Sequence, residues 1–330
     1  MPSTSPPGGN LETFPADGCF RGFGGGRVRY YRTRVDARER ILRPENIRGI
    51  RRHRFSPCVD TLFDSALTGL PNKGHTPHLM GLKNTEAIVL HTLKLGEADR
   101  IVVLFTRDSG VVRATARGAR KLKSRFGASL EPFTHIRLSY FEKENRELVS
   151  LSDTEIVRSY FSLLKEETIF TLLEYLGGLL LEFSPPHEPN EKLFRMSAAC
   201  LEGLSQAPEN RQGFASYFEI WTLKLSGFLP DLKNCGSCAR ALSEVPGRVH
   251  VGPSGNLLCN PCGDGKGFSL SHTAWSELKA ALSQPPLIWA RELELVPKGT
   301  SAEVQAFTRQ SITRALERPP RGRRNFGEST

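Results

Sequence analysis

The sequence has no long hydrophobic run and few cysteines. No apolar stretch approaches the ~18 residues that a membrane-spanning helix needs, and the opening residues MPSTSPPGGNLETF lack the apolar core of a secretory signal. The seven cysteines are an odd number, and four of them form two closely spaced pairs. This pattern favours a metal site in a reducing cytoplasm over a disulfide framework. We therefore expect a cytoplasmic protein with no membrane partner.

The common catalytic motifs are also missing. The sequence contains neither of the phosphate-binding patterns GxGxxG and GxxxxGK[ST], and neither HExxH nor GxSxG. Glu97 and Asp99 stand close together before a strand-like segment, but nothing nearby completes an acid/base pair. They are better explained as residues that orient a loop or cap a turn. We expect that the protein is not an enzyme.

Negative charge is in deficit. Forty-five Lys and Arg against 35 Asp and Glu give a formal charge of +10, which favours an anionic partner such as nucleic acid. Residues 1–79 hold thirteen Lys and Arg but seven Asp and Glu, in a Pro-, Gly- and Arg-rich context with little capacity for a core. This segment is an arginine-rich nucleic-acid-binding tail or, as we prefer, a disordered extension. A start codon set too far upstream would also explain it, since Met80 opens the patterned sequence.

Strand-like segments rich in Ile, Val and Thr follow this extension. In VVRATARG, a period of two places Arg113 and Arg117 on one face and small apolar residues on the other. Short strands with small residues on the inner face predict a compact, partly closed barrel over 80–157. An isolated meander packed on helices is the alternative. The five predicted strands are 85–93, 100–106, 111–118, 136–141 and 147–154.

The hydrophobic period then changes to that of helices, which predicts an all-α region over 158–330. Asn190 is a plausible N-cap of the second helix, and Gly227 is the expected C-terminal stop of the third. The predicted helices are 160–183, 191–204, about 210–226 and 302–317.

Four cysteines form the most specific local pattern. Cys235, Cys238, Cys259 and Cys262 have the spacing C-x2-C-x20-C-x2-C, which lets two tight turns present four thiolates to one ion. The pattern predicts a structural Zn²⁺ site in a module at about 232–268, because four thiolates leave no open position for water. The alternatives are reduced pairs without metal, or a redox pair. His250 and His272 flank the quartet and could substitute as ligands.

A cationic loop, GARKLKSRFG (118–127), follows the predicted third strand. Cations that track phosphates and aromatics that stack on bases are typical of barrels that bind single strands. An ordinary solvated loop is the alternative, and Phe133, Tyr140 and Phe141 are further aromatics nearby. The residues predicted to contact nucleic acid are Arg113, Arg117, Arg120, Lys121, Lys123, Arg125 and Phe126.

Two segments and the cysteine quartet together resemble the RecO family of bacterial recombination mediators. The segments are AIVLHTLKLGEADRIVVLFT (87–106) and GARKLKSRFGASLEPFT (118–134), and the resemblance covers about residues 82–320. It implies an α+β multidomain protein: an N-terminal OB-fold, then a helical domain with an inserted zinc-finger-like module. It also implies a nucleoid-associated DNA repair protein that binds single- and double-stranded DNA and anneals complementary strands.

The resemblance implies partners as well. These are RecR, the acidic and hydrophobic C-terminal tail of single-strand binding protein and, indirectly, RecA. The tail requires an apolar groove with a cation at its mouth, for which Phe218, Trp221 and Lys224 are the candidates. Two other functions stay open: an OB-fold RNA-binding accessory protein with a structural zinc, and a metal-dependent hydrolase.

Overall fold

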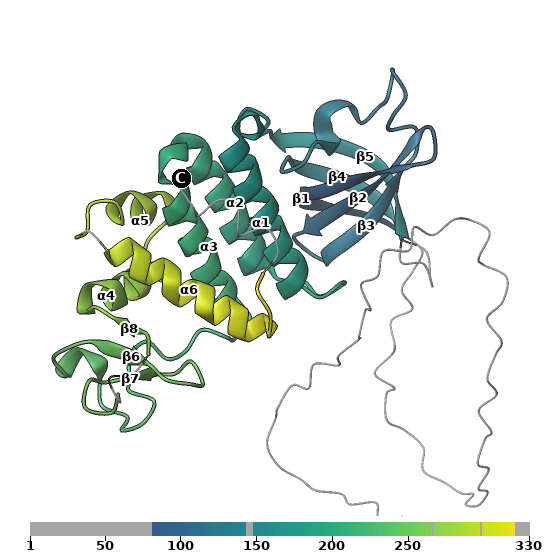
Figure 1. Ribbon diagram of the computed structural model, residues 1–330. Coiled ribbons are helices and arrows are strands. Elements are labelled where there is room, and N and C mark those ends of the chain that lie inside the picture. Colours follow the sequence, from purple (N-terminus) through teal and green to yellow (C-terminus); the bar gives the residue numbers. More distant parts are fainter. Residues whose placement is uncertain (1–80, 143–147, 264, 266, 298, 321–330) are drawn as a thin grey trace, which may run out of the picture. The chain divides into compact units, whose positions relative to one another are not determined.

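The computed structural model describes residues 81–142, 148–263, 265, 267–297 and 299–320 (Figure 1). The prediction made for residues 1–79 lies outside the described residues. A barrel of strands comes first, followed by helices that are interrupted by a small three-stranded sheet. The proposed division of the chain at residues 157 and 158 falls at the end of the last barrel strand, and it stays a prediction.

Five strands form a closed barrel in the order β1-β2-β3-β5-β4. β4 pairs antiparallel with β1, and β3 pairs parallel with β5, which closes the cylinder. The barrel is that of an OB-fold, so the predicted fold class is confirmed and the isolated meander is excluded. The strands are β1 Leu82–Leu95, β2 Asp99–Thr106, β3 Gly110–Ala116, β4 His135–Phe141 and β5 Leu148–Arg158.

The middle of β1 and the second half of β2 are apolar on both faces because each face is covered. Val89 points into the barrel core, whereas its neighbours Ile88 and Leu90 belong to a second core shared with the helices. In β2, the ring of Phe105 lies 6.0 Å from the ring of Phe194 in α2. Burial on both sides explains why the sequence shows continuous hydrophobic runs here. The sequence alternates in the second half of β3, where Arg113 is exposed and its neighbours Val112 and Ala114 are buried.

In the part of the chain that the structure describes, six α-helices follow the barrel. Asn190 caps α2, since its side-chain oxygen accepts a hydrogen bond from the N–H of Leu193 at 3.0 Å. Gly227 follows α3 with a φ of +77°, as expected for a C-terminal stop. No helix in the described part of the chain is long and apolar enough to span a membrane. The helices are α1 Glu167–Phe183, α2 Glu191–Gln206, α3 Arg211–Leu225, α4 His272–Ala280, α5 Pro286–Glu292 and α6 Thr300–Leu316.

The first helix begins later than the sequence predicted. The expected start was residue 160, but α1 begins at Glu167, after a short 3₁₀ turn at Leu163–Lys165. Tyr160 and Leu163 are buried in the core shared with the helices. Their apolar spacing therefore reflects burial of an irregular segment rather than a helical turn.

α3 is the central helix and contacts α1, α2, α5 and α6. Glu219 on α3 is completely buried. Its carboxylate accepts a hydrogen bond from the Tyr175 hydroxyl of α1 at 2.5 Å and another from the Thr308 hydroxyl of α6 at 2.5 Å. One buried acidic side chain thus joins three helices, at positions that are far apart in the sequence.

The small sheet lies in sequence between α3 and α4. Its order is β7-β6-β8, with β6 at Val249–Val251, β7 at Leu257–Leu258 and β8 at Ser269–Leu270. Polar contacts attach this insert to the helices. The Trp275 indole N–H of α4 donates to the Leu232 carbonyl at 2.8 Å, and the Arg248 guanidinium lies 2.6 Å from the Glu303 carboxylate of α6.

Candidate nucleic-acid interface and metal centre

The predicted cations all lie on the surface of the barrel. Arg113 is on β3, where its neighbours Val112 and Ala114 point into the barrel core. Arg117 follows the end of β3, and the loop from there to β4 connects the third strand to the fourth, as predicted. The exposed cations are Arg113, Arg117, Arg120, Lys121, Lys123 and Arg125. We call this set the cationic surface.

The first part of the loop is pinned to the β1–β2 turn. The N–H of Gly118 donates to the Asp99 carboxylate at 2.8 Å. Arg120 makes two contacts with the same turn: its N–H donates to the Ala98 carbonyl at 2.9 Å, and its Nη1 to the Gly96 carbonyl at 2.7 Å. Asp99 therefore orients the loop, which is one of the two roles that the sequence allowed.

The far end of the loop is held by the barrel core. Phe126 is 3% exposed and Leu130 is 1% exposed, and both belong to the barrel core cluster. The Ser129 hydroxyl donates to the Phe126 carbonyl at 2.6 Å and lies 2.5 Å from the Thr154 hydroxyl of β5. The segment between the two anchors is thus a short arch with fixed ends.

Burial corrects one predicted contact. Phe126 was expected to stack on bases, but its ring fills the barrel and is closed to a ligand. Phe133 and Tyr140 are buried too, whereas Phe141 is 46% exposed. The Arg125 guanidinium carbon lies 4.9 Å from the centroid of the Phe126 ring, so a cation also packs over this buried ring.

The six cations differ in how firmly they are held. Arg120 bonds to the Gly96 carbonyl, and Arg125 lies over Phe126. The other four have no acidic partner within the described residues: Arg113, Arg117, Lys121 and Lys123. Within the described residues, an anionic ligand can therefore reach these four charges without the breaking of an ion pair.

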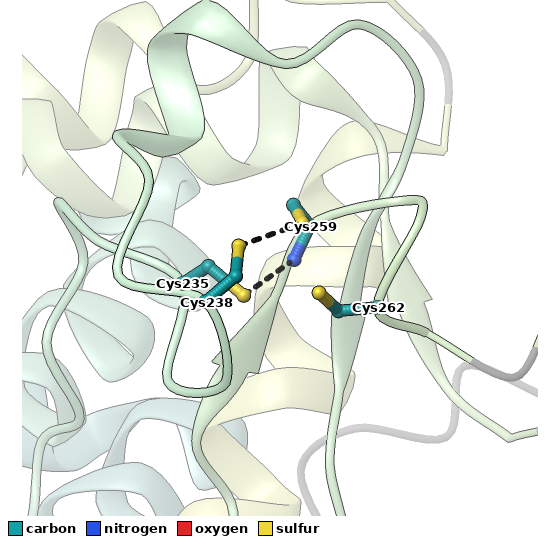
Figure 2. Close-up of side chains that lie close together, drawn as sticks. All are labelled: Cys235, Cys238, Cys259 and Cys262. Atoms are coloured by element: carbon teal, nitrogen blue, oxygen red, sulfur yellow. Dashed lines mark hydrogen bonds between the residues drawn. The ribbon is translucent and has the colours of Figure 1, made fainter.

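The four cysteines of the insert meet at one point, two from each of two turns (Figure 2). All four sulfur atoms lie within 4.8 Å of one another, and the Sγ atoms of Cys238 and Cys259 are 3.7 Å apart. A Zn–S bond of about 2.3 Å in a tetrahedral site places neighbouring sulfurs about 3.8 Å apart. The cluster therefore fits a tetrahedral ion such as Zn²⁺.

The backbone around the sulfurs favours thiolates. The N–H of Cys259 donates to the Cys235 sulfur at 3.3 Å, and the N–H of Ser237 donates to it at 3.5 Å. Burial opposes ionisation of Cys235, but such backbone hydrogen bonds outweigh it and lower the pKa to about 6. Burial raises the pKa of Cys259 to about 12. A thiolate is thus already stabilised on one turn, and a bound cation would favour ionisation of the rest.

The two flanking histidines are not ligands in this arrangement. The Nε2 atom of His250 lies 3.1 Å from the side-chain oxygen of Asn260, and His272 packs edge-on against Trp275, with ring centroids 4.8 Å apart. Neither belongs to the metal-binding group found among the described residues. The quartet is complete without them.

The candidate residues for a partner tail lie in different environments. Phe218 is 2% exposed in the helical core, so the prediction that it offers a docking surface is wrong. Trp221 is half-buried and its indole N–H donates to the Ala281 carbonyl at 2.9 Å, while Lys224 is exposed. Helical spacing alone could not distinguish a surface stripe from a helix that is covered on all sides.

An open cleft lies just beyond this helix and was missed by the sequence reasoning. Its volume is about 470 Å³. It is lined by Phe228, which is 44% exposed, by residues of the insert, and by Ser311 and Arg314 of α6. In the sequence, the aromatic Phe228 directly after the helix stop at Gly227 could have indicated it, but its exposure is known only from the structure.

The fold and the cysteine cluster define an OB-fold protein with a helical domain and an insert whose four cysteines could hold a metal ion. Family models described as Recombination protein O N terminal and Recombination protein O C terminal match residues 80–160 and 168–324. The chain belongs to the RecO family, and its role therefore lies in DNA repair and recombination.

Proteins named DNA repair protein RecO are its relatives in several bacteria. The Bifidobacterium adolescentis protein is 31% identical over 251 residues, which are 74% of this chain and 99% of that protein. The Koribacter versatilis protein is 37% identical over 163 residues, 49% of this chain and 66% of that protein. The Anaeromyxobacter sp. (strain K) protein is 34% identical over 178 residues, covering 54% and 69%.

Proposed function

We propose that this protein is a non-enzymatic recombination mediator. It binds single- and double-stranded DNA through the cationic surface, anneals complementary strands, and acts with RecR to help load RecA onto DNA coated by single-strand binding protein. It would do this in the cytoplasm, at the nucleoid. The observation that carries the proposal is a pinned loop that presents exposed cations beside Arg113 of β3.

The mechanism is electrostatic. Two complementary strands are polyanions that repel each other, and a protein that neutralises phosphates on both lowers this repulsion. If about six phosphates are neutralised on a single strand, log K should fall with log salt with a slope of roughly −4. No covalent bond is made or broken in this mechanism. The fixed geometry of the loop matters because it sets where the phosphates of the bound strand lie.

The metal is proposed to be a structural Zn²⁺ held by Cys235, Cys238, Cys259 and Cys262. A bound ion would fix the two turns of an insert that contains little regular structure of its own. The insert contacts α4 and α6 through Trp275 and Arg248, so its order supports the helical domain.

The acidic, hydrophobic tail of single-strand binding protein is proposed to occupy the cleft beyond α3. The requirement stated from the sequence was an apolar groove with a cation at its mouth. Phe228 supplies an exposed ring, and Arg314 supplies the cation. Asp231 also lines the cleft, but its carboxylate accepts hydrogen bonds from the N–H of Lys233 and the amide of Asn234. Lys224 stays a second candidate cation on the surface of α3.

The test is strand annealing. Two labelled complementary oligonucleotides are coated with single-strand binding protein and mixed with and without this protein over a salt series. We expect acceleration that weakens steeply as salt rises. Acceleration that does not depend on salt would contradict the electrostatic mechanism.

The RNA-binding alternative is tested in parallel with RNA of the same sequence. Only contacts to the 2′-hydroxyl distinguish the two nucleic acids at matched sequence. Binding to bare DNA without acceleration, together with a preference for RNA, would favour the accessory-protein function over the mediator.

A further inference from the structure

One leucine stands at the tip of the cationic arch. Leu122 lies between Lys121 and Lys123, and its relative exposure is 103%, the highest value among the exposed large hydrophobic residues of the described chain. Its side chain contributes nothing to either core cluster. The fold therefore gives no reason for an apolar residue at this position.

The backbone holds this leucine in a defined place. The N–H of Lys121 donates to the Gly118 carbonyl at 3.1 Å, and the N–H of Ser124 donates to the Lys121 carbonyl at 3.0 Å. These are two consecutive four-residue turns. Leu122 is the second residue of the later one, and its side chain is fully exposed there. The anchors at Asp99 and Phe126 then fix the turns on the barrel.

We propose that Leu122 is an apolar wedge that inserts between neighbouring bases of the bound DNA strand and partly unstacks them. The inference rests on the proposed DNA-binding function of the cationic surface. Apolar side chains, leucine among them, are known to enter base steps and open them when cations hold the flanking backbone. Here Lys121 and Lys123 would hold the phosphates on the two sides of the opened step.

Other apolar contacts of Leu122 are less well supported. A protein partner is favoured by an apolar patch with several members, but the residues next to Leu122 in the loop are charged or polar. Buried Phe126 cannot stack on bases, so the loop lacks the aromatic platform that the sequence suggested. With Phe126 buried, Leu122 is the exposed apolar side chain between Lys121 and Lys123 that can reach the stacked bases.

The consequence for annealing is direct. A wedge at one base step interrupts the stacking of the bound single strand, so its unpaired bases are presented in an opened frame that is held by phosphate contacts. The wedge should therefore change the conformation of the bound strand and the annealing rate, with little change in the electrostatic part of binding.

The experiment uses the full-length protein and a single-stranded oligonucleotide with 2-aminopurine between two adenines, whose fluorescence rises when the base is unstacked. At saturating wild-type protein, we expect a clear rise. Leu122→Ala should lose at least about half of this rise while Kd changes by less than about threefold and the salt slope stays the same, because no charge is removed. Leu122→Met, which keeps an apolar side chain, should restore most of the rise.

Leu295→Ala is the matched control, because Leu295 is 85% exposed and lies in the helical domain rather than in the arch. It should leave the fluorescence rise unchanged. Circular dichroism of each variant checks that the fold is retained, which is expected since Leu122 packs against no core.

Each result decides between explanations. An undiminished fluorescence rise with Leu122→Ala, or no rise with the wild type, would overturn the wedge. A loss of annealing only on DNA coated with single-strand binding protein, with an unchanged rise on bare DNA, would show a protein contact and would also overturn it. Failure of the underlying function is distinguishable, because Lys121→Ala/Lys123→Ala would then leave DNA binding intact.

Discussion

The Asp99 carboxylate accepts a hydrogen bond from the backbone N–H of Gly118 at 2.8 Å. This contact joins the turn after β1 to the start of the cationic loop, nineteen residues further along the chain. An acidic residue directly beneath a cationic surface should weaken anion binding if only charge mattered. Because Asp99 holds the start of the loop, we expect its structural effect on DNA binding to be larger than the effect of its negative charge.

Asp99→Ala is expected to weaken DNA binding although it makes the net charge more positive. The loss of a hydrogen bond to a charged acceptor should cost about 1.5–3 kcal/mol of folding free energy, and the start of the loop should become mobile. Kd for single-stranded DNA and urea unfolding measure the two effects. Glu97→Ala makes the same charge change at an exposed neighbour, so it should leave affinity equal or slightly higher. Tighter binding by Asp99→Ala would show that charge outweighs loop position.

Lys121→Ala/Lys123→Ala removes two cations that have no acidic partner within the described residues. On single-stranded DNA the salt slope should become less steep by about 1.4, since each lost phosphate contact contributes roughly 0.7. Binding should weaken similarly for all sequences, because phosphate contacts carry no sequence information. Titrations at several salt concentrations measure the slope.

The matched control for this pair is Lys192→Ala/Arg195→Ala, which removes the same charge from exposed positions on α2. Its slope should stay near the wild-type value. Equal slopes for the two double variants would show that overall charge, and not the cationic surface, determines binding.

Metal analysis of the purified protein should find one Zn²⁺ per chain. Cys235→Ser should lose it, because the substitution removes one of the four clustered sulfur atoms and the acceptor of backbone hydrogen bonds from both turns. The insert should then become sensitive to protease at about 232–268, while the barrel keeps its fold. Cys200→Ser is the control: this thiol is 2% exposed in the helical core, where burial raises its pKa, and it should keep the metal. A metal-free wild type with an ordered insert would contradict the structural role.

Folding stability should fall as pH drops below about 6.5, in part through His135. Burial lowers the pKa of His135 from its usual 6.5, although the nearby Glu86 carboxylate acts in the opposite direction. Below 6.5 the unfolded chain therefore binds a proton before the folded chain does, which favours unfolding until the lower folded-state pKa is passed. Urea unfolding from pH 5 to 8 would show this.

His135→Gln should make the stability less dependent on pH over this range. His91→Gln, at an exposed position of β1, is the control and should leave the pH dependence as in the wild type. An unchanged slope with His135→Gln would mean that other groups cause the acid sensitivity.

Local patterns determined much of this protein before any fold was known. The β-branched runs predicted all five strands, because alternation and Thr, Ile and Val content are properties of short segments. The spacing of Cys235, Cys238, Cys259 and Cys262 predicted one cluster, since paired cysteines two residues apart reach the same ion whatever surrounds them. The loop cations could be placed on the surface because unpaired charges are rarely buried.

The tertiary structure alone determined which side chains are buried and which residues far apart in the sequence form hydrogen bonds. Phe126 and Phe218 are core residues because the barrel and the neighbouring helices close over them, which no local pattern records. Asp99 reaches Gly118, and Glu219 joins Tyr175 to Thr308, because the fold brings these positions together. Residue type and spacing are local and can be read along the chain, whereas burial and hydrogen-bond partners depend on how separate segments pack, so only the folded chain determines them.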